Sequence, residues 1–240
     1  MSVIARRTPR TAQIVLRIAK QVLSDAKSRG QVVDERIFDI SAPRHREREP
    51  RFPTWADAEQ LADWMPESIS RIVPFALASG LREGELLRLT DDDVDLRRGT
   101  VAVRQSKTRS GVRTVELAGV AVQLLREQLL ARTPNQRGLV FPTPTGCRWD
   151  RHTFMSRVFR PAVRRAKLDG MTFHDLRHGH VSLMAAAGVH PTTIAHLVGH
   201  SDDGALLMRR YRHLFPDEAG RAVAAFEQHV RGSATSCVGR

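Results

Sequence analysis

The sequence predicts a mainly α-helical protein with one small antiparallel β-sheet, an α+β fold. Apolar residues recur at helical spacing over most of the 240 residues, and the pattern changes only near the middle. There, two short β-type runs, residues 100–103 and 112–117, flank the polar turn QSKTRSG, which is typical of a hairpin. No internal repeat is found, so we expect one helical domain with a hairpin insert.

The chain begins with one amphipathic helix and a linker. Residues 11–29 place apolar side chains on one helical face, and Gly30 ends the pattern. A single amphipathic helix has no partner to cover that face. Residues 41–53 are charged and punctuated by proline, as in a linker between domains. We therefore expect residues 1–50 to be the remnant of an N-terminal domain and its linker.

The main domain is expected to span residues 51–231, before a flexible tail at residues 232–240. Thr54 is suited to cap its first helix, and the apolar helix over residues 69–79 ends at Gly80. Further helices are expected at residues 54–64, 120–131, 152–167, 174–187, 192–198, 205–213 and 217–230.

The composition favours a polyanionic partner. Lys and Arg outnumber Asp and Glu by 38 to 26, which gives a net charge of +12 and a pI near 11.2. Such side chains neutralise phosphates with release of counterions, although ribosomal and membrane-surface proteins share this signal. With 41% apolar residues in 26.9 kDa, the chain can also build a packed core.

Cysteine use and hydropathy favour a soluble cytoplasmic protein. Cys147 and Cys237 are far apart and form neither a disulfide framework nor a metal-type pair. The longest apolar run, residues 69–81, contains Arg71 and Pro74 and is too short to cross a bilayer. The basic N-terminus lacks the apolar core of a signal peptide. We therefore expect no membrane association.

Tyr211 is the single tyrosine of the chain and the first candidate for chemistry. It lies in LLMRRYRHLF, downstream of an HDLRH cluster. A phenol attacks a phosphodiester only if neighbours take up its proton and hold the charge of the phosphate. Taken alone, the ring is better explained as an aromatic side chain packed on a helix face. The side chains that would support chemistry are Arg82, Lys107, His174, Arg177, His178 and His200.

Arg82 and Lys107 are weak candidates when each is taken singly. In LASGLREGEL, Arg82 follows a helix-ending glycine and starts the next helix, where its guanidinium and the helix-end amides can face a phosphate. Lys107 lies in the hairpin turn and can fold over a ligand as a proton donor. Surface arginines and solvated turn lysines are nevertheless commoner than phosphate ligands.

The HDLRH cluster is more specific. His174, Arg177 and His178 fall at positions i, i+3 and i+4 of a helix, so they share one face and repel unless an anion lies among them. Because His174 with His178 and His196 with His200 are also i,i+4 pairs, a His-ligated zinc enzyme is the alternative. Neither pair encloses a Glu, and Arg177 adds positive charge where a metal needs carboxylates. The sequence thus favours no metal and no cofactor.

Taken in order, LASGLREGEL, the hairpin lysine, HDLRH, LVGHS and RRYRH resemble the motifs of the tyrosine recombinase (phage integrase) family, including the Xer type. The ordered set is far more specific than any one motif. The resemblance implies the catalytic fold of that family and a site-specific recombinase that cuts and rejoins DNA through a 3′-phosphotyrosyl intermediate. The implied catalytic residues are Arg82, Lys107, His174, Arg177, His200 and Tyr211, supported by Glu85 and His178.

The resemblance also implies a role for each residue. Tyr211 attacks the scissile phosphorus, and Arg82 and Arg177 hold the non-bridging oxygens. The histidine of LVGHS is a further donor to the phosphate. His174 accepts or orients the proton of the tyrosine, and Lys107 protonates the leaving 5′-oxygen. No metal ion is needed, because the cations replace it.

Two departures from the family pattern bear on activity. The stretch from His200 to Tyr211 is slightly longer than usual, and of the preceding DNA-clamping domain only the last helix is found. The implied partners are double-stranded DNA, further copies of this chain in a tetramer on DNA, and a partner recombinase or accessory factor. The alternative function is a truncated remnant or accessory DNA-binding protein that does not complete recombination.

Overall fold

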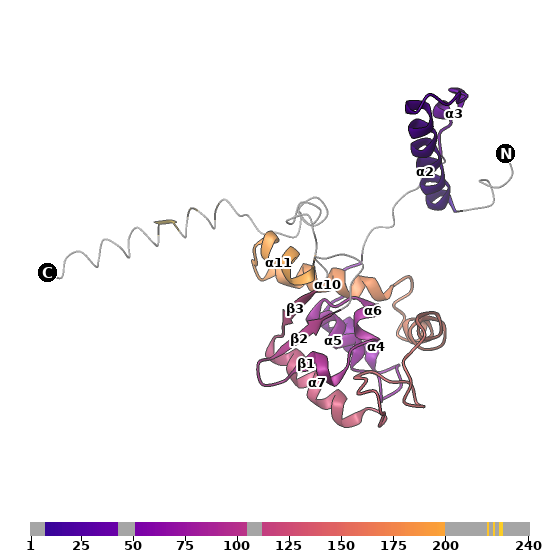
Figure 1. The fold of residues 1–240 in the computed structure, drawn as a ribbon. Coiled ribbons are helices and arrows are strands. Elements are labelled where there is room, and N and C mark those ends of the chain that lie inside the picture. The colour runs from indigo at the N-terminus through magenta and orange to yellow at the C-terminus, as the bar shows by residue number, and fades with distance from the viewer. Residues whose placement is uncertain are drawn as a thin grey trace. The chain divides into compact units, whose positions relative to one another are not determined.

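The computed structural model describes residues 8–42, 51–104 and 112–199, together with Gly220, Val223, Phe226 and Glu227. The chain divides into two compact units, Met1–Glu49 and Pro50–Arg240 (Figure 1). The predicted fold, mostly helical with a small antiparallel sheet, is confirmed. The helices expected at residues 205–213 and 217–230 lie outside the described residues, apart from the four single positions. No helix in the described part is long and apolar enough to cross a membrane.

The first unit contains α2 (Pro9–Ser28) and α3 (Arg36–Asp39). Thr8 caps α2, because its hydroxyl accepts a hydrogen bond from the backbone N–H three residues on. Lys20 of α2 donates to the backbone carbonyl of Phe38 in α3 and so ties the two helices together. Several apolar side chains of α2 are exposed: Ile14, Val15, Ile18 and Val22.

Helix α5 (Ile72–Ser79) is the centre of the second unit. It is buried along nearly its whole length because α4 (Trp55–Ala62), α7 (Gly119–Ala131) and α10 (Phe173–Ala186) pack against it (Figure 1). Its sequence IVPFALAS has no polar stripe, as expected for a helix without a solvent face. The helix begins later than the sequence predicted, and this start puts Pro74 in the first turn, where a missing N–H is tolerated.

Strands β1 (Val94–Asp95), β2 (Thr100–Val103) and β3 (Arg113–Glu116) form one antiparallel sheet in that order. Successive side chains of a strand point to opposite faces. Val115 is buried, and Arg113, two residues before it, points to the same inner face with its side chain only 6% exposed. The sheet therefore delivers a guanidinium to the interior of the unit.

The helix predicted over residues 152–167 is built from three pieces. α8 (Arg151–Phe154) leads into a π-helical turn, Met155–Phe159, which leads into α9 (Arg160–Arg165). Pro161 has no N–H for the carbonyl four residues before it, so the α-helical ladder is broken and the wider turn takes its place. Apolar periodicity predicts a helix here but does not distinguish α-helical from π-helical turns.

Two short helices frame the candidate site beside α10. Gly80 ends α5 with a left-handed φ of 64°, and α6 (Glu83–Leu86) begins directly after Arg82. α11 (Pro191–Val198) packs on the C-terminal half of α10 in an apolar cluster of its own, and Gly199 ends it with a φ of 68°. Both glycines adopt a conformation that other residues avoid, which fixes where each helix stops.

Candidate active site

The Glu85 carboxylate holds two arginines in place. It accepts hydrogen bonds from Arg82 through Nη1 at 2.9 Å and through the backbone N–H at 2.8 Å. Arg113 adds two bonds of 3.2 Å, one to each carboxylate oxygen. Burial by itself would raise the pKa of Glu85, but the hydrogen bonds and charges of Arg113 and Arg82 outweigh burial and lower that pKa below its ordinary value. The carboxylate therefore stays charged between the two guanidinium groups.

Arg177 is a buried cation that joins three helices. Its residue is only 3% exposed on α10. Nη1 donates to the backbone carbonyl of Gly80, at the end of α5, over 2.7 Å. Nη2 donates to the carbonyl of Val198, at the end of α11. The flat guanidinium satisfies both acceptors at once, which a lysine ammonium on its flexible stem does not.

Three arginines meet at the C-terminal end of α11. They donate to three consecutive backbone carbonyls, which lack partners within the helix and lie at the negative end of its dipole. The pairs are Arg113 Nε with Leu197 at 3.0 Å, Arg177 Nη2 with Val198, and Arg82 Nη2 with Gly199 at 3.0 Å. The next residue along the chain is His200. The cationic groups thus gather where the candidate histidine begins the following segment.

His174 and His178 lie one turn apart on α10, and their rings meet edge to face with centroids 4.7 Å apart. His174 is exposed and His178 is half-buried, whereas Arg177 is buried. The three side chains predicted to share one face therefore differ in depth. Positions i+3 and i+4 diverge around a helix, so one group can turn inward while the other stays outward.

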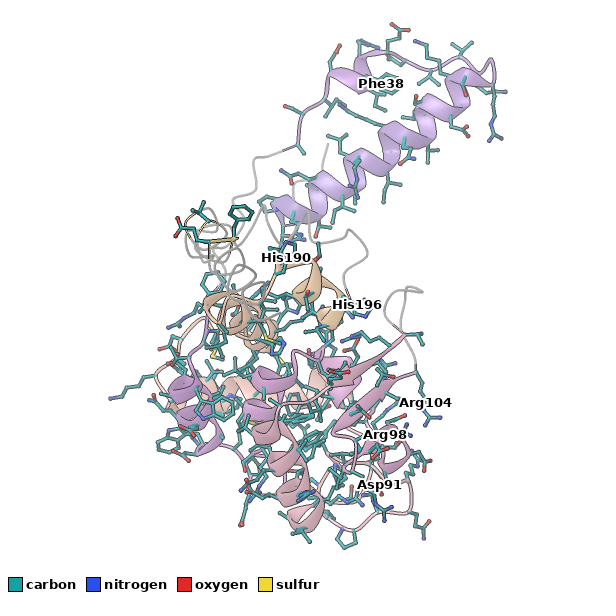
Figure 2. All side chains as sticks on the ribbon, turned by 90° about the vertical axis from the view of Figure 1, so that its left-hand side faces the viewer. Phe38, Asp91, Arg98, Arg104, His190 and His196 are labelled. Carbon is teal, nitrogen blue, oxygen red and sulfur yellow. The ribbon has the colours of Figure 1, made fainter. Side chains whose placement is uncertain are left out.

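Three of the predicted site residues, Lys107, His200 and Tyr211, lie outside the described residues. The structure brings Arg82, Glu85 and Arg177 together and places the two imidazoles of HDLRH on the same helix as Arg177. His196 of the alternative zinc pair is exposed on α11 (Figure 2). Over the ranges that the structure describes, no three His, Cys, Asp or Glu side chains are grouped to hold a metal ion.

Sequence reasoning missed Arg113. The sequence predicts only that this residue belongs to the short β run at residues 112–117. The alternation of the strand was the available signal, since buried Val115 two residues later places Arg113 on the inner face. A buried guanidinium needs an anionic partner, and Glu85 supplies it.

Sequence reasoning also missed His180. Its ring is buried on α10, and Nδ1 lies 2.9 Å from the carbonyl of Leu77, to which it donates as a neutral imidazole. Burial lowers the pKa of His180 to about 4; the hydrogen bond to Leu77 opposes this shift, and the charge of Arg177 reinforces it. The ring also covers Gly80, where a Cβ would lie 2.5 Å from Cδ2. His180 is thus a neutral, buried side chain that packs against Gly80.

A cavity of about 390 Å³ borders the other side of Glu85, near the sheet. Its wall includes four arginines: Arg88, Arg104, Arg137 and Arg148. Arg104 is held at the end of β2 by Asp93, with Nε 2.8 Å from Oδ1. Figure 2 shows Arg104 on the same side of the unit as Arg98. The same wall also includes the carboxylates of Glu85, Asp92 and Asp93, so four guanidinium groups and three acidic side chains line this cavity.

The fold is similar to that of solved integrases and recombinases. The lambda integrase fragment solved bound to DNA has a TM-score of 0.67 at 21% identity, covering 87% of this chain and 78% of that one. The XerA recombinase has a TM-score of 0.59 at 23% identity, covering 95% and 79%. At such identities the likeness concerns the fold alone.

The chain belongs to the phage integrase family, whose model matches residues 56–218. The resemblance drawn from the motifs is thereby confirmed. The integrase of Salmonella phage P22 is 26% identical over 214 residues, covering 84% of this chain and 53% of that protein. The integrase of Streptomyces ambofaciens is 30% identical over 222 residues, covering 80% and 57%. The chain spans about half the length of these relatives.

Proposed function

We propose that residues 51–231 cut and rejoin DNA strands as a site-specific recombinase, through a 3′-phosphotyrosyl intermediate. The observation that carries the proposal is the meeting of Arg82 and Arg177 on adjacent carbonyls directly before His200. Two guanidinium groups held at adjacent carbonyls, by partners from different helices, form a preorganised site for a phosphate that accepts hydrogen bonds from both. Membership of the phage integrase family supports the same reaction.

The arginines stabilise the reaction where charge develops. As the phosphorus becomes five-coordinate, negative charge grows on its non-bridging oxygens, and Arg82 and Arg177 donate to them. Glu85 keeps Arg82 oriented through its two bonds. Because Arg82 is 35% exposed while Arg177 is buried, Arg82 is the group that DNA reaches first.

The chemistry of strand transfer is a displacement at phosphorus. The Tyr211 oxygen forms a bond to phosphorus, and the bond from phosphorus to the 5′-oxygen breaks. His174 takes up or orients the phenolic proton, while Lys107 gives a proton to the leaving 5′-oxygen. His200 donates a further hydrogen bond to the phosphate. Reversal by a 5′-hydroxyl of another strand reseals the DNA, so no hydrolysis and no external energy source is required.

The partner is double-stranded DNA, bound mainly through its phosphates. The net charge of +12 supports this. A solved lambda integrase is a dimer on a core site. By analogy, this chain assembles on DNA carrying two inverted sites, up to a tetramer, with a partner recombinase or accessory factor as further members.

A covalent-capture experiment tests the proposal. The probe is a mixture of random-sequence duplexes, each nicked so that cleavage near the nick releases a short oligonucleotide and prevents resealing. We expect the full chain to form a protein–DNA adduct that survives SDS, and mass spectrometry to find the DNA on Tyr211. Sequencing the captured duplexes gives a defined substrate for later measurements.

Tyr211→Phe is the matched control. It should bind the same duplexes with unchanged affinity and give no adduct, because only the phenolic oxygen is removed. An adduct in this variant would reject Tyr211 as the nucleophile. DNA binding without any adduct in the parent chain would reject the recombinase and favour the accessory DNA-binding protein.

A further inference from the structure

We propose that Arg113 is a positioning residue for this reaction, which holds Arg82 and the end of α11 in fixed register. The inference rests on the proposed function and adds a residue that the sequence motifs did not single out. Arg113 belongs to β3, whereas the groups it holds belong to α6 and α11. It is therefore the link through which the sheet sets the geometry of the helical part of the site.

All three guanidinium nitrogens of Arg113 donate hydrogen bonds. Nη1 and Nη2 each lie 3.2 Å from one oxygen of Glu85, and Nε lies 3.0 Å from the carbonyl of Leu197. The side chain is only 6% exposed. Its Nε, Nη1 and Nη2 all donate to acceptors of the protein itself, so we infer that its effect on the reaction is exerted through its neighbours.

One of those neighbours is Arg82. The Glu85 carboxylate accepts four hydrogen bonds, two from Arg82 and two from Arg113. Without Arg113, the carboxylate is held on one side only and can rotate about its own side-chain bonds. Arg82 then loses a rigid partner while keeping its charge. We therefore expect the Arg82 guanidinium to keep its charge but to lose its orientation toward the phosphate.

The second neighbour is the chain end of α11. Arg113 holds the Leu197 carbonyl, and Gly199 packs directly on its side chain, since a Cβ at that position would lie 3.1 Å from Cδ and 3.2 Å from Nε. His200 follows at once. Arg113 thus fixes the position at which the segment carrying the proposed histidine leaves the helix.

The size of the effect follows from the geometry needed for displacement at phosphorus. A misplacement of about 1 Å by a change away from the reacting atoms can cost about 10²-fold in rate. Arg113→Met fills similar space and removes all three donors, so we expect adduct formation about 10²-fold slower. Arg113→Lys keeps a charge near Glu85 but lacks the fork, so a partial rescue to about 10-fold slower is expected.

Arg132 offers a matched control. It also binds one carboxylate with its fork, Nη1 and Nη2 lying 2.7 and 2.9 Å from the Asp91 oxygens, and it also holds a backbone carbonyl, that of Leu139 at 2.9 Å. Neither partner bonds to Arg82, Glu85 or Arg113, although Leu139 also lines the cavity beside Glu85. Arg132→Met therefore removes the same type of interaction and should leave the rate of adduct formation within about 2-fold of the parent.

The experiment measures two quantities on the captured nicked duplex. One is the rate constant of adduct formation at saturating DNA, and the other is the dissociation constant for DNA, measured with the Tyr211→Phe background to prevent cleavage. We expect Arg113→Met to lower the rate constant and leave the dissociation constant unchanged. Combined with Glu85→Gln, it should slow the reaction by less than the product of the two single effects, because both act on Arg82 through one contact.

The outcomes separate this proposal from the one on which it rests. No adduct in the parent overturns both. An active parent with Arg113→Met as fast as Arg132→Met overturns the positioning role alone, as does weaker DNA binding with an unchanged rate at saturation. A urea titration shows whether Arg113→Met is folded. If it is not, the rates of Arg113→Lys and Gly199→Ala are measured instead, because each variant disturbs the same contact. Normal rates in both variants would refute the inference.

Discussion

Replacing Arg177 by lysine should weaken both the fold and the reaction. The guanidinium bridges at least two buried carbonyls, those of Gly80 and Val198. A lysine ammonium keeps the charge but reaches only one of them well, so one buried hydrogen bond to a charged donor is lost. Such a bond contributes about 1.5–3 kcal/mol. We expect the free energy of unfolding to fall by that amount and cleavage to slow by roughly 10²-fold or more.

The stability change can be measured within the second unit alone. All three tryptophans, Trp55, Trp64 and Trp149, lie in that unit, so their fluorescence in urea reports its unfolding. With a urea dependence of about 1–3 kcal/mol per molar, the midpoint should fall by about 1 M. Cleavage is then measured in buffer without urea, where the variant remains folded. Arg160→Lys, an exposed replacement of the same kind, should change neither quantity.

Two results would refute this reasoning. An unchanged urea midpoint would mean that the guanidinium does not hold the two carbonyls together. A lowered midpoint with normal cleavage would mean that Arg177 stabilises the fold without contacting the phosphate.

Three further predictions follow from groups around the site. Burial lowers the pKa of His180 from 6.5 to about 4, so as the pH falls the unfolded chain binds this proton before the folded chain does. The free energy of unfolding should therefore fall by about 3 kcal/mol between pH 6.5 and pH 4. His180→Asn should remove that part of the change in urea midpoint. Gly179→Ala should destabilise the second unit by about 1–3 kcal/mol in the same titration, because its Cβ would lie 2.7 Å from both Leu77 and the Pro53 carbonyl, and a stable variant would show that the helix can shift. Replacing Arg137 and Arg148 together by alanine should reduce the log–log salt slope of DNA binding by about 2, whereas the double lysine variant should keep it; equal slopes in parent and alanine variant would exclude the cavity from the DNA contact.

Much of the fold was readable from the sequence because local signals agreed with the tertiary structure. The strand at residues 100–103 has the predicted bounds, and the capping box of Thr54 and the left-handed Gly80 lie where the residue types indicated. Two of the differences from the predicted helices lie at prolines. Pro74 and Pro161 each alter the hydrogen bonding of a helix without changing its apolar periodicity, so a pattern of apolar residues does not locate the change.

The site was only partly readable, for a different reason. The residues proposed to face a ligand could be singled out from the motifs because their types are unusual at that spacing. Arg113 and His180 act on other protein groups, and their importance depends on burial and on partners distant in the sequence. The sequence around Arg113 does not indicate that Glu85 is its partner. Strand alternation gives the direction of such a side chain but not what it meets.

The three arginine contacts at the end of α11 also bear on the order of folding. Arg82 reaches a carbonyl 117 residues away, and Arg113 one 84 residues away, so the corresponding loops must close before the cations gather. Contacts of such high sequence separation form late, and we expect replacements at Arg82 and Arg113 to speed unfolding with little effect on the folding rate, giving φ-values near zero. A φ-value near one would contradict this. On the proposed function, a partly folded chain would lack the cationic pair and could not cut DNA, so cleavage would require the completed fold.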